Sequence, residues 1–299
     1  MSNAKSLRSE LLSTSSIQAL VSLLGLANVF ILTQIYSPSQ LGFFFFILAF
    51  IQLFFSISDL GSSTAYLRTL IDPKKSQEKS FVSYTILKLI LIAISSLIVL
   101  GSYLFLDKNK FIEVIDPADH LFLFVLIFLS VAFKALSIIG ETQLFFLQKP
   151  NIALIPKLAA AILRIGGLLV VSQYGLNATI TSYVVILLIS EIVQSLWYGV
   201  LLKEDLIEAL DEKNKGNVLN FVGQSLPFSA INISFQVEQN LERVLIGTLL
   251  SLEWLALYMI ALRIVDVVEI AARQVVGVLL PAFSIAPVSY THLRAHETR

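Results

Sequence analysis

Long apolar runs, separated by short polar connections, divide the chain into eight segments. They cover residues 11–36, 41–67, 81–105, 120–147, 152–171, 179–202, 221–250 and 254–281. A helix rises about 1.5 Å per residue, so about 20 residues cross a hydrocarbon core of about 30 Å. The runs are continuous rather than alternating, which favours helices over the strands of a barrel. The pattern predicts an all-α polytopic membrane protein with eight transmembrane helices.

The first two runs are joined by a polar hinge at residues 36–40. Pro38 can stop one helix, and Ser37 and Ser39 can cap the next. The hinge therefore predicts a transmembrane helical hairpin, a plan that the rest of the chain repeats.

Composition agrees with a lipid environment, since 56% of the residues are hydrophobic and only 14% are charged. Soluble domains typically carry roughly 25% charged residues. The formal net charge is zero, which gives no indication of a nucleic-acid partner. The absence of cysteine excludes disulfides and thiolate metal sites.

Lysine and arginine in the connections predict the orientation, because these residues favour the cytoplasmic side. Ten lie on the side of the N-terminus and two, Lys108 and Lys110, on the other. We therefore expect a multi-pass protein of the bacterial inner membrane with a cytoplasmic N-terminus. The ten are Lys5, Arg8, Arg68, Lys74, Lys75, Lys79, Lys149, Lys203, Lys213 and Lys215.

The longest connection on the cytoplasmic side, residues 203–220, predicts a polar helix at the membrane surface that joins two lobes. Residues 1–202 would form a six-helix lobe, and residues 221–286 would begin a second lobe. A sequence match between residues 37–44 and residues 251–258, which lie 214 positions apart, supports this division into two lobes. Both open with Ser and carry Leu fifth, a small residue sixth and an aromatic eighth, as expected for a parallel transporter repeat.

The final segment, residues 287–299, breaks the apolar pattern and holds two of the three histidines. It resembles the translated sequencing-adaptor tails found at broken ends of reading frames. We expect it to be non-native and the natural protein to continue beyond Ala286. The alternative is a genuine polar C-terminus.

Four cations within the apolar runs are candidate substrate-binding residues: Lys134, Arg164, Arg243 and Arg263. Charged side chains in the membrane are costly and face a polar interior or a partner. Cations that face inward from several helices would form a wet, positive cavity. Such a cavity suits an anionic group such as pyrophosphate, which Arg binds through bidentate hydrogen bonds and Lys as a point charge.

Structural ion pairing is the alternative explanation for some of these charges. Arg263 lies three residues before Asp266, and Glu269 lies four before Arg273, so each pair can form on one helix. Lys134 and Arg164 have no such local partner. Lys88 and Lys157 lie near the cytoplasmic ends of their runs, where we expect them to snorkel.

The seventh run is unusually polar, and it contains Pro227, which should kink the helix. Kinked polar helices line transport paths, although polar side chains also hold helices together by hydrogen bonds.

Two stretches resemble bacterial polysaccharide flippases, the Wzx-type O-antigen and teichoic-acid exporters of the MOP superfamily. The first is Tyr-Ser-Pro-Ser-Gln-Leu-Gly-Phe from Tyr36, followed by Asp-Leu-Gly-Ser-Ser-Thr-Ala-Tyr-Leu-Arg from Asp59. The second is Leu-Glu-Arg-Val-Leu-Ile-Gly from Leu241, followed by Leu255–Tyr258 and Leu280–Phe283. Here Glu242 stands for the usual Asp and Ala256 for the usual Gly.

The resemblance implies two six-helix lobes that rock about a cationic central cavity. It implies transport of a polyprenyl-pyrophosphate-linked oligosaccharide outward for lipopolysaccharide or other surface-polysaccharide synthesis. The partners would be this lipid-linked oligosaccharide, membrane lipids and polysaccharide-assembly proteins, with no nucleic acid. The four cations would then contact the headgroup or the glycan.

Two other functions stay open on the sequence. A cation-coupled multidrug antiporter of the same superfamily would use membrane carboxylates for ion coupling, and the candidates are Asp59, Glu191, Glu242 and Asp266. A membrane glycan polymerase or ligase would need large outward loops with Arg, His and Asp, whereas the longest such loop here spans residues 107–119. No metal-ligand spacing, phosphate loop or nucleophile motif is visible, so we expect no enzyme activity and no metal or other cofactor.

Overall fold

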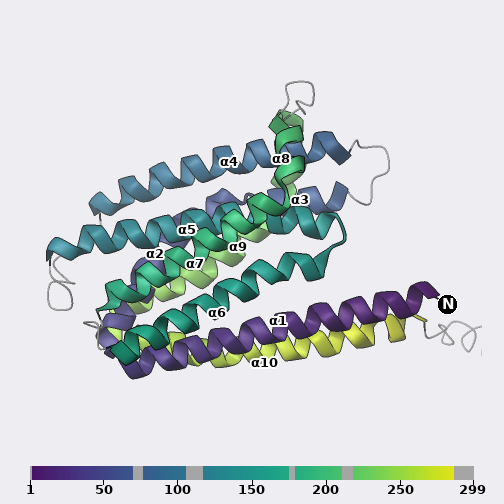
Figure 1. The fold of residues 1–299 in the computed structure, drawn as a ribbon. Helices are drawn as coiled ribbons and strands as arrows, with labels where there is room; N and C mark the ends of the chain where they lie inside the picture. The colour runs from purple at the N-terminus through teal and green to yellow at the C-terminus, as the bar shows by residue number, and fades with distance from the viewer. Residues whose placement is uncertain (1, 70–76, 106–116, 175–178, 211–217, 286–299) are drawn as a thin grey trace, which may run out of the picture.

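The computed structural model describes residues 2–69, 77–105, 117–174, 179–210 and 218–285, and every long element in these ranges is a helix. The long helices run roughly side by side, and the short α8 crosses the end of the bundle near α3 (Figure 1). The helices are α1 (Ser2–Ile35), α2 (Pro38–Phe55), α3 (Ser62–Arg68), α4 (Gln77–Ser102), α5 (Pro117–Phe146), α6 (Pro150–Tyr174), α7 (Ile180–Leu201), α8 (Lys203–Leu210), α9 (Val218–Leu249) and α10 (Leu252–Ile285), with 3₁₀ turns η1 (Ser56–Ser58) and η3 (Tyr103–Phe105).

Six of these helices, within the described residues, are long and apolar enough to cross a membrane. The six spans lie in α1, α2 with η1, α4, α5, α6 and α7. Helices α9 and α10 have 32 and 34 residues, which is ample length, but neither is among the six. The all-α polytopic fold is confirmed, whereas the count of eight membrane crossings stays a prediction.

Most helix boundaries lie within a few residues of the predicted apolar runs, and local chemistry explains the first hinge. Ser37 caps α2 through its hydroxyl, which accepts a hydrogen bond from the backbone N–H of Gln40. The Gln40 side chain accepts one in return from the backbone N–H of Ser37, which completes a capping box. Pro38 occupies the first turn of α2, where a missing N–H costs nothing.

The second predicted run, 41–67, is not one helix. Helix α2 ends at Phe55, and α3 begins only at Ser62. Between them Leu60 and Gly61 have positive φ angles of 38° and 69°. A left-handed backbone interrupts the helical hydrogen bonds and favours glycine, so the Asp-Leu-Gly sequence breaks the run.

In the connection after α7, where the sequence predicts a helix over 203–220, residues Lys203–Leu210 form α8, which contacts α4 and α7. Residues 211–217 lie outside the described ranges, and 218–220 already belong to α9.

Helix α2 lies at the centre of the bundle and contacts α4, α5, α9 and α10. The four consecutive phenylalanines Phe43–Phe46 are at most 4% exposed. Four adjacent helix positions point to all sides, so their burial requires neighbours all round α2. Helix α2 therefore packs both against other helices of the first six spans and against the pair α9–α10.

The hairpins α1–α2 and α9–α10 correspond at the offset found in the sequence. Helix α1 ends at Ile35 and α2 begins at Pro38, while α9 ends at Leu249 and α10 begins at Leu252. Each boundary is therefore 214 residues from its counterpart. We call the end of the bundle that holds both connections the hairpin end.

The helix caps repeat at the same offset. The N–H of Gln40 donates to the Ser37 hydroxyl at 3.3 Å, and the N–H of Trp254 donates to the Ser251 hydroxyl at 3.3 Å. The short sequence match therefore corresponds to a serine cap at the same place in the two hairpins.

Glycines let the two hairpins approach closely at the hairpin end. A Cβ atom on Gly42 would lie 1.8 Å from the backbone oxygen of Leu252. A Cβ atom on Gly247 would lie 2.6 Å from the ring of Phe46. Because only hydrogen fits at these positions, α2 is closely packed against both α9 and α10 there.

Candidate functional site

Lys134 lies in the middle of α5, and its side chain is exposed although it is far from either helix end. Charges from three other helices act on its ammonium group: Glu191 on α7, Arg164 and Lys157 on α6, and Arg263 on α10. No hydrogen bond or ion pair of Lys134 is found within the described ranges. Lys134 is therefore an exposed cation in the middle of a long helix, and charged groups on three other helices act on it.

Arg164 lies on α6 and is held by two neighbouring residues of α7. Its Nη2 atom donates to Glu191 Oε1 at 2.7 Å, and its Nε atom donates to Ser190 Oγ at 2.8 Å. The Arg164 side chain is 26% exposed, whereas that of Glu191 is only 4% exposed. As predicted, Arg164 has no carboxylate partner on its own helix. Its counter-charge comes from Glu191 on the next helix, α7.

Arg263 on α10 forms the predicted ion pair with Asp266, with 3.2 Å between Nη1 and Oδ2. Arg263 follows Ala256 and Met259 on one face of the helix, and both of these are buried. The Arg263 and Asp266 side chains are nevertheless 45% and 48% exposed. The face of α10 that packs tightly near the hairpin end is therefore open farther along the helix.

Arg243 lies on α9, nearer the hairpin end. Its Nη1 atom donates to Asn240 Oδ1 at 3.4 Å, which is a long hydrogen bond. Its Nε atom is buried and has no partner among the described residues. The nearby charges are those of Arg263, Asp266 and Glu242.

The four predicted cations thus lie close enough to one another for their charges to interact. Lys134 lies near Arg164 and Arg263, and Arg263 in turn lies near Arg243. They differ in pairing, because Arg164 and Arg263 have carboxylate partners. Lys134 and Arg243 have none among the ion pairs of the described part of the chain.

Three of the four carboxylates named as ion-coupling candidates are engaged with cations. Glu191 pairs with Arg164 and Asp266 with Arg263. Asp59 accepts a short hydrogen bond from the ammonium of Lys88. Glu242 is exposed on α9 and lies beside Tyr258 and Arg243.

The expectation that Lys88 snorkels to the interface is wrong. Its side chain is fully buried and reaches Asp59 at the end of η1, not the water. Asp59 also accepts hydrogen bonds from Ser63 at 2.6 Å and from Asn232 of α9 at 3.2 Å.

Lys157 likewise pairs with Glu141 at 2.5 Å instead of extending alone. In both pairs the carboxylate lies on a different element from the lysine, so the hydropathy pattern along the chain cannot identify it. Arg273, the expected partner of Glu269, lies outside the described side chains.

Sequence reasoning also missed Ser190, whose hydroxyl positions Arg164. The signal was present, since Ser190 and Glu191 are adjacent polar residues within an apolar run. The depth at which they would meet α6 depends on how the two helices are aligned, and the sequence does not state that.

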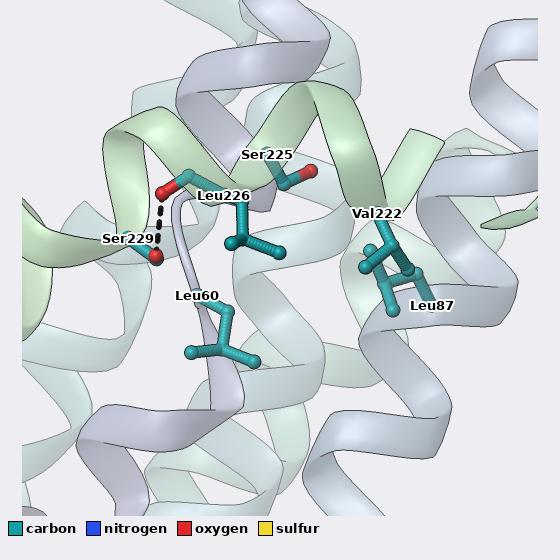
Figure 2. Close-up of a pocket in the computed structure, with 6 residues that line it drawn as sticks. All are labelled: Leu60, Leu87, Val222, Ser225, Leu226 and Ser229. Atoms are coloured by element: carbon teal, nitrogen blue, oxygen red, sulfur yellow. Dashed lines mark hydrogen bonds between the residues drawn. The ribbon is translucent and has the colours of Figure 1, made fainter. Parts of the chain in front are cut away.

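A small pocket of about 60 Å³ lies between α4, α9 and the α2–α3 connection, and its lining residues carry no charge. Figure 2 shows that Leu60 and Leu226 lie close together within it, with Val222 beside Leu87. Its other lining residues are Ser225 and Ser229, which flank Pro227 inside α9. The pocket is apolar and too small for a sugar, so we assign the charged region around Lys134 as the candidate site.

The model of a family described as Polysaccharide biosynthesis protein matches residues 7–286. No curated protein and no solved structure matches the chain at a significant level.

Proposed function

The chain belongs to the polysaccharide biosynthesis protein family, and from that premise we propose that it is a flippase for lipid-linked oligosaccharide. The substrate is a polyprenyl-pyrophosphate-linked oligosaccharide for cell-surface polysaccharide synthesis. The chain moves it across the bacterial inner membrane by alternating access around the cations near Lys134. The N-terminus is cytoplasmic, the hairpin end faces outward, and the chain catalyses no bond-breaking reaction.

The observation that carries this proposal is the ammonium of Lys134, which is exposed in the middle of α5 and lacks an ion pair within the described ranges. An ionised side chain at this depth costs several kcal/mol unless water or a counter-charge reaches it. A pyrophosphate supplies that counter-charge. The guanidinium groups of Arg164 and Arg263 lie nearby and add directed hydrogen-bond donors.

Alternating access is supported by the difference between the two ends of the helix pair α2–α10. At the hairpin end, Gly42 packs directly against Leu252. Farther along α10, Arg263 and Asp266 on the packed face are exposed. In the proposed orientation, the tightly packed end of the pair is the outward end, and the exposed Arg263 and Asp266 lie nearer the cytoplasmic side. Separation of the hairpin end would complete the cycle.

The antiporter alternative is less well supported by the site. A coupling carboxylate must be available to a proton or cation, and Asp59 and Glu191 already face Lys88 and Arg164. For the polymerase or ligase alternative, the loop that would carry catalytic groups lies mostly outside the described residues. His120 beside it is buried, with its ring centroid 5.7 Å from that of Phe43.

Export in living cells tests the proposal. In a bacterium that lacks the natural gene, expression of the protein should restore surface polysaccharide and prevent accumulation of its lipid-linked precursor. Restored tolerance to cationic drugs without restored polysaccharide would support the antiporter instead. Precursor that is exported but stays unpolymerised or unattached would support the polymerase or ligase.

A further inference from the structure

Glu191 is the one described carboxylate that acts on both Arg164 and Lys134. It accepts a hydrogen bond from Arg164 Nη2 at 2.7 Å, and its charge is the attraction that acts on the Lys134 ammonium. Two cations therefore share one acid, and a net positive charge is left for a ligand. The carboxylate of Glu191 also reduces that net positive charge, so it affects which anionic ligands the site binds.

The second oxygen of Glu191 is unsatisfied. Oε2 is buried and has no hydrogen-bond partner among the described residues, while the whole side chain is 4% exposed. An ionised carboxylate only accepts hydrogen bonds and has room for several, so one donor leaves most of its capacity unused. A buried acceptor without a partner is costly. A ligand that brought hydroxyl donors next to its phosphates would satisfy it.

The charge of Glu191 also discriminates among phosphates. Repulsion between the carboxylate and a ligand grows with the negative charge of the ligand and is strong where water is scarce. A diphosphate that is esterified at both ends carries less negative charge than a diphosphate with one free end. The carboxylate therefore penalises inorganic pyrophosphate and prenyl diphosphate more than it penalises a prenyl diphosphate that bears a sugar.

We infer that Glu191 is a specificity-determining residue that selects glycosyl diphosphate esters over diphosphates without a sugar. The phosphates lie between Lys134 and Arg164, and hydroxyls of the first sugar donate to Glu191 when its side chain turns toward them. This inference rests on the proposed function, because it assumes that the two cations bind the headgroup. It assigns Glu191 to substrate selection, not to ion coupling.

A pair of soluble probes tests the inference: farnesyl diphosphate, and the same molecule carrying N-acetylglucosamine on its terminal phosphate. Binding of both to the full chain in lipid nanodiscs is measured by calorimetry. The wild type should prefer the sugar-bearing probe. Glu191→Gln should reduce that preference by about tenfold, through tighter binding of farnesyl diphosphate and weaker binding of the glycosylated probe.

Two further carboxylate variants sharpen the comparison. Glu191→Asp keeps the charge but shortens the reach, so it should keep the weak binding of farnesyl diphosphate and lose part of the gain from the sugar. Glu141→Gln removes a different ion pair, that of Glu141 on α5 with Lys157 on α6, and it should leave the preference unchanged.

The outcomes separate the inference from the proposed function. If Glu191→Gln changes the affinity for both probes by the same factor, Glu191 is only a counter-ion and the inference is wrong. If Lys134→Ala and Arg164→Ala weaken neither probe, or if the wild type binds neither, the proposed cation site itself is rejected. If Glu191→Gln does not fold, Glu191→Asp decides, because an unchanged preference in that variant overturns the inference.

Discussion

The Ser39 hydroxyl donates a hydrogen bond of 2.9 Å to Oε1 of Glu253, and these residues are 214 positions apart. The same offset relates Ser37 to Ser251 at the caps of α2 and α10. Ser39 thus contacts its own counterpart in the second hairpin. In a two-fold arrangement such a contact lies on the axis, since only there can a position meet its equivalent. The hairpin end is therefore the place where two rocking halves would meet and part.

Cysteine cross-linking tests whether this contact must open. The chain contains no cysteine, so Ser39→Cys with Glu253→Cys introduces the only two thiols. We expect oxidation to link them and to stop export, and reduction to restore it, because the linked ends of α2 and α10 cannot separate. Each single cysteine variant is the control and should export normally under oxidation. Undiminished export by the linked protein would show that the hairpin end is not a gate.

Gly42→Ala should weaken the same contact by crowding. The added methyl would lie 1.8 Å from the backbone oxygen of Leu252, so α2 and α10 must move apart. Overpacking of this kind typically costs about 1–3 kcal/mol. The expected results are a lower Tm in detergent and a lower yield of the Ser39–Glu253 cross-link. Gly25→Ala has no atom within 4 Å of its new methyl and should change neither measurement.

Lys88→Met should destabilise the protein strongly, because it leaves the carboxylate of Asp59 without its cation. Breaking a buried ion pair from one side costs about 3–5 kcal/mol. The double variant with Asp59→Asn should recover much of the loss in thermal unfolding. Lys157→Met is the control: its pair with Glu141 is partly exposed, with 33% of the Lys157 side chain accessible, and should cost less than about 1 kcal/mol. Equal losses for the two lysine variants would contradict this account.

The helices could be predicted from the sequence because apolar length, Pro38 and the Ser37 cap act locally. The break at Gly61 was missed, since hydropathy continues across it. The signal was the glycine after Asp59 and Leu60, which permits the positive φ angle. Local backbone chemistry was therefore more informative there than the apolar pattern.

The site was predicted only in part, for a different reason. Charged residues in a membrane are conspicuous, so Lys134 and Arg164 could be selected from the sequence. Their pairing depends on how α6 and α7 align, and the apolar faces of both helices permit many alignments. The sequence therefore identifies Glu191 as a membrane carboxylate, whereas its pairing with Arg164 is visible only in the structure.

The most direct test of the central claim is translocation by purified protein in liposomes. A fluorescent glycan linked through diphosphate to a polyprenyl chain is followed from one leaflet to the other. Lys134→Ala should abolish its movement with the protein still folded, and Lys134→Arg, which keeps the charge, should preserve a substantial part of it. Wild-type rates for folded Lys134→Ala would contradict the account, because the exposed cation in the middle of α5 would then have no part in transport.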